Sequence, residues 1–310
     1  MATDHAKADA LPWQLRGHEQ ARDLLRNMPA RSLLITGPDG VGRRLLARWY
    51  AALLNCTQAG TEPCGQCASC RLWHGGHPDY LEVGPAATTT TGRLNRRPEI
   101  RISQIVPREG AADEPLYTWL ERRPLHSWRV GVIDSAHLLT TAAANSFLKM
   151  LEEPPSWVKI VLIAPEPRSL LPTIASRVTT VRLGTVDTSG MEPAGHPAHQ
   201  LGTPGPLERA NSSMADWQEA DAAVSTYVSA LHGGLDGALQ AAIDLEPVWL
   251  GKATFDVPQM LRAELRRLAP GTFGEADAAI ARAEEQLASY VSAQVALQLL
   301  TLELRELLSS

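Results

Sequence analysis

Short apolar runs alternate with longer periodic stretches in the first part of the chain. The runs cover residues 33–35, 77–83, 129–134, 157–164 and 179–183. Runs of this length between turn residues are typical of buried strands, and the stretches between them carry apolar residues at the three- and four-residue spacing of helices. Strands that alternate with helices predict an α/β fold with a parallel sheet, and we expect this domain to cover residues 1–183.

The pattern changes after residue 183. Residues 184–213 are rich in Gly, Pro, Thr, Ser and His and have little apolar periodicity, which predicts a linker. Apolar stripes at helical spacing follow, first over residues 220–231 and 235–245. We therefore expect a linker and a small helical domain over residues 184–246, and a second helical domain over residues 247–310.

The last periodic stretch differs from the others because it is apolar on more than one face. It covers residues 276–308 and predicts one long helix. A helix that is apolar nearly all round is buried on several sides. An oligomer interface is therefore the expected place for this C-terminal helix.

Length and charge narrow the class of protein. A chain of 310 residues has room for two or three domains. Its formal net charge of −5 gives no global basic field that would bind nucleic acid unaided. The N-terminal segment is polar, its first ten residues are expected to be disordered, and no apolar run approaches the roughly 18–20 residues of a membrane span. We expect a cytoplasmic protein.

A glycine-rich turn after the first predicted strand matches most of a phosphate-binding loop. In the pattern G-x-x-x-x-G-K-[ST], backbone N–H groups cradle phosphates, the Lys reaches the terminal phosphates and the hydroxyl holds Mg²⁺. Gly37 and Gly42 stand at the glycine positions with Gly40 between them, but Arg43 and Arg44 replace the Lys and the hydroxyl residue. Guanidinium only donates hydrogen bonds and cannot ligate magnesium. We expect a degenerate loop with weak or no nucleotide binding; an ordinary turn is the alternative.

A second feature of nucleotide hydrolases is also incomplete. The predicted strand over residues 129–134 ends in Asp134, at the position of the acid that supports Mg²⁺ in such enzymes. A Glu usually follows and activates water, but here Ser135 follows. Asp134 is thus a candidate nucleotide-site residue without a general base beside it.

All four cysteines lie in one short segment of the chain. They are Cys56, Cys64, Cys67 and Cys70. A secreted disulfide framework would spread its cysteines, whereas a cluster of two overlapping C-x-x-C units and one further Cys indicates a metal. Four thiolates make a closed tetrahedral zinc site, which is structural because catalytic zinc keeps an open position. A redox or incidental cluster is the alternative, and the nearby His74 and His77 are expected to be surface or turn residues.

Several motifs together resemble those of the bacterial clamp-loader AAA+ proteins. The most specific is residues 144–155, Ala-Asn-Ser-Phe-Leu-Lys-Met-Leu-Glu-Glu-Pro-Pro, which is similar to the family signature Asn-Ala-Leu-Leu-Lys-x-Leu-Glu-Glu-Pro. The resemblance extends over nearly the whole chain. It includes the glycine loop, the cysteine cluster and residues 77–80, 133–137, 173–178 and 288–304. It implies a P-loop AAA+ domain with an inserted zinc module, a helical lid and an all-α collar.

The resemblance implies one of two subunit types. Gamma/tau-type subunits hydrolyse ATP with an intact loop, a second acid after the strand-end Asp, and an Arg near the start of a lid helix. Here the three places hold Arg43-Arg44, Ser135 and Asp236. All three losses together resemble the non-hydrolysing delta-prime type, so we expect no ATPase activity from the chain alone. The alternative is a gamma/tau-type DNA-dependent ATPase.

The resemblance also assigns a role to Arg177. Residues 173–178 are similar to the family's Ser-Arg-Cys motif, with Val178 in place of the Cys. The implied role of Arg177 is an arginine finger that enters the ATP site of a neighbouring subunit, and Ser176 is expected to orient it. Such fingers stabilise charge on the transferring phosphoryl group.

Partners follow from the same resemblance. It implies assembly with gamma/tau and delta subunits within the DNA polymerase III holoenzyme. Through that complex the chain is expected to act on the sliding clamp and on primed DNA. A membrane is not expected among its partners. The expected cofactor is structural zinc, and ATP binding is doubtful. A zinc-containing DNA-binding protein without ring partners is a further alternative, which the acidic balance of the chain disfavours.

Overall fold

The chain forms two compact units, Met1–Val186 and Asp187–Ser310, in the computed structural model. The structure describes residues 13, 15–58, 60–85, 98–107, 114–191, 205, 214–250, 257–288 and 292–309. Three expectations from the sequence fall outside these residues in whole or in most part. They are the disorder of the first ten residues, a loop over residues 84–98, and the linker over residues 184–213.

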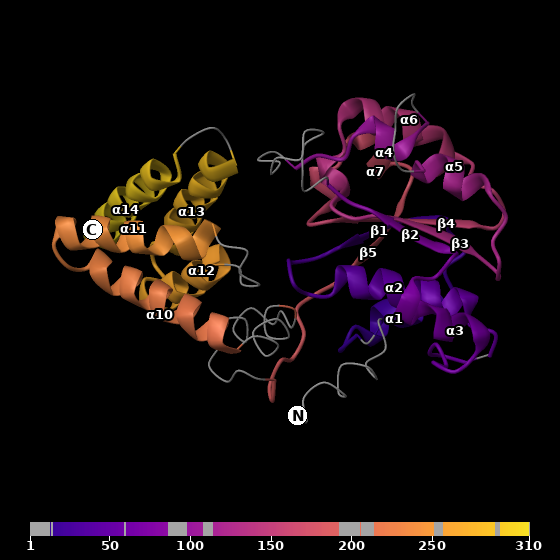
Figure 1. Cartoon of the computed structure of the whole chain (residues 1–310), viewed down its shortest axis with the longest axis horizontal. Coiled ribbons are helices and arrows are strands. Elements are labelled where there is room, and N and C mark those ends of the chain that lie inside the picture. The colour runs from indigo at the N-terminus through magenta and orange to yellow at the C-terminus, as the bar shows by residue number, and fades with distance from the viewer. Residues whose placement is uncertain are drawn as a thin grey trace. The chain divides into compact units, whose positions relative to one another are not determined.

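The first unit is built on a five-stranded parallel sheet (Figure 1). Its strand order is β2-β3-β4-β1-β5. The strands are β1 (Ser32–Thr36), β2 (Tyr80–Val83), β3 (Arg129–Ile133), β4 (Val158–Ala164) and β5 (Thr179–Arg182). Each predicted apolar run overlaps one of them, so the predicted parallel α/β fold is confirmed.

Helices cover both faces of this sheet (Figure 1). One face carries α1 (Glu19–Arg26), α2 (Arg43–Asn55) and α3 (Ala68–Leu72); the other carries α4 (Ile102–Ile105), α5 (Leu116–Glu121), α6 (Thr141–Glu152) and α7 (Pro172–Ala175). Short 3₁₀ turns cover Trp73–Gly75, Ala136–Leu138 and Pro167–Ser169. Leu33 and Ile35 pack into the core on one face and Leu34 into the core on the other. Burial on both faces explains why the strands read as continuous apolar runs.

Helix α6 carries the specific signature segment and has clear end signals. The Thr140 side chain accepts a hydrogen bond from the Ala143 N–H at 3.3 Å, which caps the first turn. Pro154 and Pro155 follow Glu152 and Glu153, and proline cannot continue a helix. The ends of α6 are therefore set by local sequence.

The second unit is all-helical. It contains α10 (Met214–Leu231), α11 (Leu235–Leu250), α12 (Val257–Leu268), α13 (Phe273–Ala288) and α14 (Ala293–Ser309). All five contribute buried side chains to one hydrophobic core. The predicted all-helical C-terminal region is confirmed, and the predicted division into a lid over residues 184–246 and a collar over residues 247–310 stays a prediction.

The prediction of one long final helix over residues 276–308 is wrong. The segment forms two helices, α13 and α14, which pack against each other (Figure 1). The Ser292 carbonyl accepts the Ala296 N–H at 3.0 Å and so starts α14. Leu297, Leu300 and Leu304 of α14 are buried in the core of the second unit, whereas Val295 and Leu302 on its other apolar face are each 46% exposed.

A buried hydroxyl pair adds a polar link within the second unit. Tyr227 Oη of α10 and Thr301 Oγ1 of α14 lie 2.9 Å apart, and Thr301 also donates to the Leu297 carbonyl at 2.7 Å. Burial raises the pKa of Tyr227 to about 12, and its hydrogen bond to Thr301 partly opposes that rise. This pair ties helices that are far apart in the sequence.

Within the described residues, every helix is too short or too polar to cross a bilayer.

Candidate functional site

The glycine-rich loop connects β1 to α2, at the carboxyl end of a central strand. Gly37, Gly40 and Gly42 have φ values of 151°, 75° and 105°, a region that favours glycine. A Cβ on Gly37 would lie 2.6 Å from the Leu183 carbonyl oxygen, and one on Gly42 would lie 2.7 Å from Leu15 Cδ1. The glycines are therefore required by the backbone and by close packing against the same chain.

The loop is also bonded to neighbouring segments of its own unit. The Gly37 N–H donates to the Pro165 carbonyl at 3.1 Å, and His18 Nε2 lies 2.9 Å from the Val41 carbonyl oxygen. The Val41 side chain is fully buried. The strand–loop–helix context of a phosphate loop is present, and its backbone is fixed by internal contacts.

Arg43, at the position of the phosphate-contacting Lys, turns back onto the loop. Its Nη2 forms an ion pair with Asp39, four residues earlier. Its Nη1 is buried and has no hydrogen-bond partner among the described residues. The positive charge that a terminal phosphate would need is thus partly neutralised by the loop itself.

Arg44, at the position of the hydroxyl residue, lies between two carboxylates. Its guanidinium forms an ion pair with Glu82, and its Nε lies 3.4 Å from Asp134 Oδ2. Glu82 also contacts Arg48 at 3.2 Å and accepts the Tyr80 hydroxyl at 2.8 Å. Glu82 lies near the end of β2 and Asp134 just after β3. The structure therefore places Asp134 beside the first turn of α2, in contact with Arg44.

Ser135 and His137 follow Asp134 at the edge of this region. Ser135 has a φ of 56°, one of two non-glycine residues with positive φ among those described. Burial, aided by the nearby Arg43, lowers the pKa of His137, whose Nδ1 is buried without a hydrogen-bond partner among the described residues. Residue 135 itself is a serine, which offers no carboxylate.

Arg177 lies elsewhere, directly after α7. Its Nε donates to Glu152 Oε1 at 2.5 Å, and its Nη1 donates to the Thr173 carbonyl at 2.7 Å and to Ser176 Oγ at 3.1 Å. Nη2 also lies 2.5 Å from Glu152 Oε1. The side chain keeps 31% exposure. Ser176 thus contacts Arg177 directly, and the main anion facing Arg177 is a carboxylate of its own chain.

Asp236, the third position that departs from the hydrolysing subunits, is exposed in the first turn of α11. Acidic side chains are favourable at a helix N-terminus. In the second unit this residue therefore has a local structural reason to be acidic.

The four cysteines lie close enough together to bind a metal ion. Their sulfur atoms all lie within 4.8 Å of one another, and none is in a disulfide. Backbone N–H groups point at these sulfurs, for example Cys67 N at 3.3 Å from Cys64 Sγ and Cys70 N at 3.4 Å from Cys67 Sγ. The pKa of Cys67 is lowered to about 5, because hydrogen bonds from Thr57 and Cys70 outweigh the effect of burial.

A second group of possible ligands, His77, Asp79 and His126, is a hydrogen-bonded network. Asp79 is fully buried and accepts the backbone N–H groups of Leu125 and His126 at 2.7 and 2.8 Å. The His77 ring is bonded on both sides, by Ser69 Oγ at 3.0 Å and the Asp79 N–H at 3.1 Å. Both ring nitrogens are therefore engaged in hydrogen bonds within the fold.

His77 is buried, so the prediction that it is a surface or turn histidine is wrong for burial. Its side chain is only 4% exposed, and its ring stacks on Trp73 with centroids 5.1 Å apart. Burial lowers the pKa of His77 to about 4, against the opposing effect of Asp79. A neutral imidazole in this environment joins the cysteine-containing segment to the start of β2.

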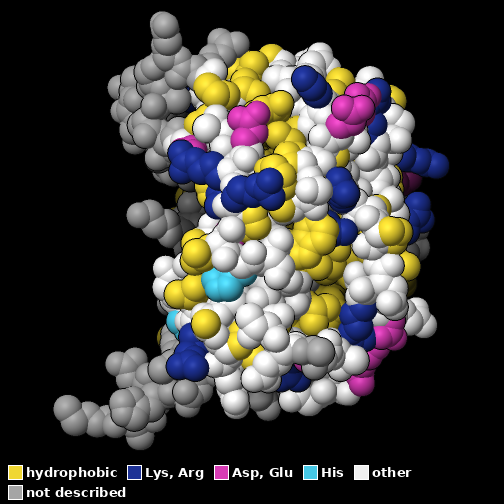
Figure 2. All heavy atoms as spheres, turned by 90° about the vertical axis from the view of Figure 1, so that its right-hand side faces the viewer, with side chains coloured by type: hydrophobic (Ala, Val, Ile, Leu, Met, Phe, Trp, Pro, Cys, Tyr) yellow, Lys and Arg dark blue, Asp and Glu magenta, His cyan; other side chains and the backbone are white. Residues whose placement is uncertain are grey.

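Basic side chains do not form one continuous surface on the face of the first unit seen in Figure 2. Lys and Arg stand there in several separate groups, with apolar and acidic side chains between them. This distribution agrees with the net acidic composition. On this face, a broad electrostatic footprint for nucleic acid is missing.

Comparison with known families identifies the first unit. Residues 18–187 match the family described as "DNA polymerase III, delta subunit". The chain belongs to this family. The matched range contains the glycine loop, the cysteine cluster, Asp134 and Arg177, and it ends close to the boundary of the first unit at Val186.

Individual relatives come from two subunit types. "DNA polymerase III subunit delta'" of Pseudomonas aeruginosa is 34% identical over 172 residues, which are 55% of this chain and 47% of that protein. "DNA polymerase III subunit gamma/tau" of Mycobacterium bovis is 34% identical over 145 residues, which are 46% of this chain and 22% of that protein. The chain thus spans less than half the length of these curated relatives.

A solved structure from Thermotoga maritima, described as a DNA polymerase III, gamma subunit-related protein, covers 93% of this chain and 98% of its own. Its sequence identity is 18% and its TM-score 0.46. A likeness at this level carries no inference about the function of this chain.

The resemblance to delta-prime-type subunits, stated from the motifs, is confirmed by the family match and the Pseudomonas relative. Percentage identity is equal for the two subunit types, so it does not separate them. The sequence analysis did not single out Glu82, which forms an ion pair with Arg44. The available signal was the position of Glu82 at the end of a predicted strand.

Proposed function

We propose that the chain is a non-hydrolysing, delta-prime-type subunit of a DNA polymerase III clamp loader. In this role it assembles with gamma/tau and delta subunits and helps to load the sliding clamp on primed DNA. It contributes Arg177 to the ATP site of a neighbouring subunit and does not turn over ATP itself. The names of the relatives support the complex, and the chemistry of the loop supports the subunit type.

The observation that carries the proposal is the state of the loop. Arg43 is paired with Asp39, and Arg44 is paired with Glu82 and Asp134. ATP hydrolysis in P-loop proteins needs a Mg²⁺ ion held by a hydroxyl and an acid, and a group that positions water. Here the hydroxyl is replaced, the acid is engaged by an arginine, and Ser135 offers no carboxylate.

The geometry at α7 supports the arginine-finger role. Arg177 has partial exposure at the end of a short helix, and Ser176 and the Thr173 carbonyl orient its guanidinium. Glu152 occupies the guanidinium in the isolated chain. A γ-phosphate carries more negative charge than one carboxylate, so an ATP site of a neighbouring subunit can displace Glu152.

The direct test replaces Arg177 in a reconstituted complex with gamma/tau and delta subunits. Arg177→Ala is expected to leave assembly unchanged, as judged by size-exclusion chromatography, and to lower DNA-stimulated ATP hydrolysis. Loss of a finger costs on the order of 10³–10⁵-fold at the site that it serves. Arg168→Ala is the matched control, because Arg168 is also an exposed arginine in this region. Equal ATPase rates for the Arg177 and Arg168 variants would remove the finger from the proposal.

A gamma/tau-type ATPase is the second candidate, and one observation favours it. Gamma/tau relatives align with the first unit at the same identity as the delta-prime relative. The two candidates differ in the isolated chain, which is expected to bind Mg·ATP weakly or not at all and to release no phosphate. Turnover by the isolated chain that disappears in Asp134→Ala would favour the gamma/tau type.

We also propose that the four cysteines hold one structural zinc ion. Zinc–thiolate bonds of about 2.3 Å in a tetrahedron put sulfur atoms about 3.8 Å apart. Cys64 Sγ and Cys70 Sγ lie 3.9 Å apart. Cys70 is fully buried, and burial raises the pKa of its thiol, so a thiolate there needs a cation beside it. Metal analysis of gently purified protein is expected to give one zinc per chain, and Cys70→Ser less; a metal-free, fully folded wild type would exclude the site.

The second unit is proposed to provide the contacts that hold the ring together. Val295, Leu299 and Leu302 are 46%, 43% and 46% exposed and recur at helical spacing on α14. An apolar stripe of this kind is typical of an interface. The proposed occupant is the helical domain of a neighbouring subunit, and Leu299→Glu is expected to weaken assembly while leaving the helical content of the isolated chain unchanged.

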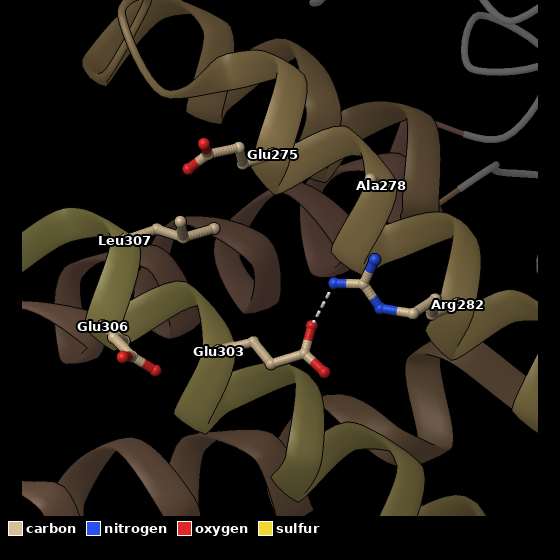
Figure 3. A pocket seen from close by; sticks show the side chains of 6 residues that line it. All are labelled: Glu275, Ala278, Arg282, Glu303, Glu306 and Leu307. Carbon is tan, nitrogen blue, oxygen red and sulfur yellow. Dashed lines mark hydrogen bonds and ion pairs between the residues drawn. The ribbon is translucent and has the colours of Figure 1, made fainter.

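A pocket beside this stripe extends the proposed interface (Figure 3). It has a volume of about 460 Å³ and lies between α13 and α14. Its lining residues are Glu275, Ala278, Arg282, Glu303, Glu306 and Leu307. Arg282 pairs with Glu303 across the pocket at 2.6 Å. Glu303 is paired with Arg282, so the Glu275 carboxylate that lines the same pocket favours a basic side chain of the partner at this place.

A further inference from the structure

The carboxyl ends of β2 and β3 bring two carboxylates together. The strands are parallel neighbours in which Glu82 is paired with Val132 and Val83 with Ile133. Asp134 follows directly, and its N–H donates to the Val83 carbonyl at 2.8 Å. The Glu82 and Asp134 side chains therefore emerge side by side at one edge of the sheet, facing the first turn of α2.

These carboxylates are largely removed from water. Their side chains are only 13% and 21% exposed. Burial raises the pKa of Asp134, the charge of Glu82 adds to this rise, and Arg44 opposes it. Two neighbouring carboxylates in such a place need a cation between them. Arg44 supplies it, since one guanidinium contacts both.

The position of Arg44 in the sequence gives this contact a meaning. Arg44 stands where a complete phosphate loop has the hydroxyl that binds Mg²⁺, and Asp134 stands where such proteins have the acid that supports the same ion. A metal between those two places would sit next to the carboxylates that Arg44 now contacts. The guanidinium is thus in the region where a divalent ion would otherwise be.

The charges around the loop balance without any added ion. Arg43 is paired with Asp39, Arg44 with Glu82 and Asp134, and Arg48 with Glu82. A helix with two arginines in its first turn and no acidic residue there is disfavoured by its dipole unless anions face it. The carboxylates of the loop and of the strand ends are those anions.

We propose that Arg44 is a built-in cation that replaces Mg²⁺ in this chain. It neutralises Glu82 and Asp134 and joins α2 to the ends of β2 and β3, so that the loop keeps its conformation without metal or nucleotide. Replacement of Arg44 by the hydroxyl residue of a complete loop leaves two carboxylates and a hydroxyl, which are oxygen ligands of the kind that Mg²⁺ and Mn²⁺ prefer. The wild-type chain is then indifferent to divalent cations at this place, and the Arg44→Thr chain is not.

The experiment compares full-length wild type, Arg44→Thr and Arg44→Lys. Thermal unfolding is followed with millimolar Mg²⁺ and with sodium chloride of equal ionic strength, without a chelator so that thiolate-bound metal is retained. For wild type, and likewise for Arg44→Lys, the unfolding temperature is expected to be the same in Mg²⁺ as in sodium chloride. Arg44→Thr is expected to unfold at a lower temperature in sodium chloride and to recover part of the loss in Mg²⁺.

Mn²⁺ binding locates the effect and does not depend on the stability of a variant. Electron paramagnetic resonance of Mn²⁺ is expected to detect binding to Arg44→Thr at an affinity at least about tenfold above that of wild type, because a guanidinium at contact distance repels the ion. Arg44→Thr/Asp134→Asn is expected to lose this binding.

Two results would overturn the proposal. One is Mn²⁺ binding by wild type that Asp134→Asn abolishes, since the site is then open despite Arg44; this measurement remains available if Arg44→Thr fails to fold. The other is a folded Arg44→Thr chain with no response to either ion.

Discussion

Two arginine sites in the first unit use the same side chain in opposite ways. Arg44 lies between Glu82 and Asp134, two carboxylates that are mostly buried. Arg177 is held by one carboxylate, Glu152, which is 47% exposed, and by groups of the α7 turn. Arg44 itself is 54% exposed, but its two partners are mostly buried and cannot turn away to solvent, whereas the half-exposed partner of Arg177 can. From this difference we expect that Arg44 serves the structure of the fold and that Arg177 is the arginine more easily released to another molecule.

The glycine-rich loop between β1 and α2 is fixed by contacts within its own chain, so a substitution there is expected to lower the free energy of unfolding strongly. Gly37→Ala puts a side chain at positive φ and within 2.6 Å of the Leu183 carbonyl oxygen. We expect a loss of about 2–4 kcal/mol in the free energy of unfolding, measured with urea. Gly184→Ala is the control, because a Cβ there has nothing within 4 Å. Equal stability of the two variants would mean that the loop is not fixed by its own chain.

The buried hydrogen-bonded network around His77 also serves the structure of the fold. It makes the free energy of unfolding depend on pH. The folded pKa of about 4 lies below the ordinary histidine value of 6.5, so between these values the unfolded chain takes up a proton that the folded chain does not. The contribution to stability is complete above the unfolded pKa and is lost as the pH falls. From neutral pH to about pH 5 this amounts to about 2 kcal/mol.

His77→Gln isolates that contribution, because other titrating groups are shared by both proteins. The unfolding free energy of wild type is expected to fall more steeply with pH than that of His77→Gln. Parallel pH profiles would contradict the assignment of a buried, neutral imidazole.

The smallest expected effect concerns the ion pair between Arg177 and Glu152. Arg177 must leave Glu152 before it contacts a phosphate, and an exposed ion pair contributes at most about 1 kcal/mol. Glu152→Gln is therefore expected to raise the DNA-independent ATPase of the reconstituted complex about two- to fivefold. Glu153→Gln, an exposed neighbour, is the control. A decrease with Glu152→Gln would mean that the carboxylate positions Arg177 productively instead of restraining it.

Local signals explain which features could be predicted from the sequence. The strands were predictable because residues such as Leu33, Leu34 and Ile35 are buried on both faces of the sheet. The loop was predictable from glycine spacing, and the cysteine cluster from its short separations. The contact of Arg44 with Glu82 was not, because the two residues lie far apart in the sequence and meet only through the arrangement of α2 and β2.

The same distinction explains the error at the C-terminus. Apolar residues continue at helical spacing through both α13 and α14, so periodicity alone does not reveal where one helix ends and the next begins. The role of the second apolar face depends on which helix packs against it, and that is decided by the whole core of the second unit. The prediction that His77 is a surface or turn residue was wrong for a related reason, because its burial depends on Trp73 and Asp79 together.

The central claim is that the useful chemistry lies at Arg177 and not at the loop, and one ATPase comparison tests it most directly. Complexes of equal composition are assembled with wild type, Arg177→Ala or Asp134→Asn, and DNA-stimulated phosphate release is measured. We expect a strong loss with Arg177→Ala and a rate close to wild type with Asp134→Asn. A loss with Asp134→Asn together with a wild-type rate for Arg177→Ala would contradict it.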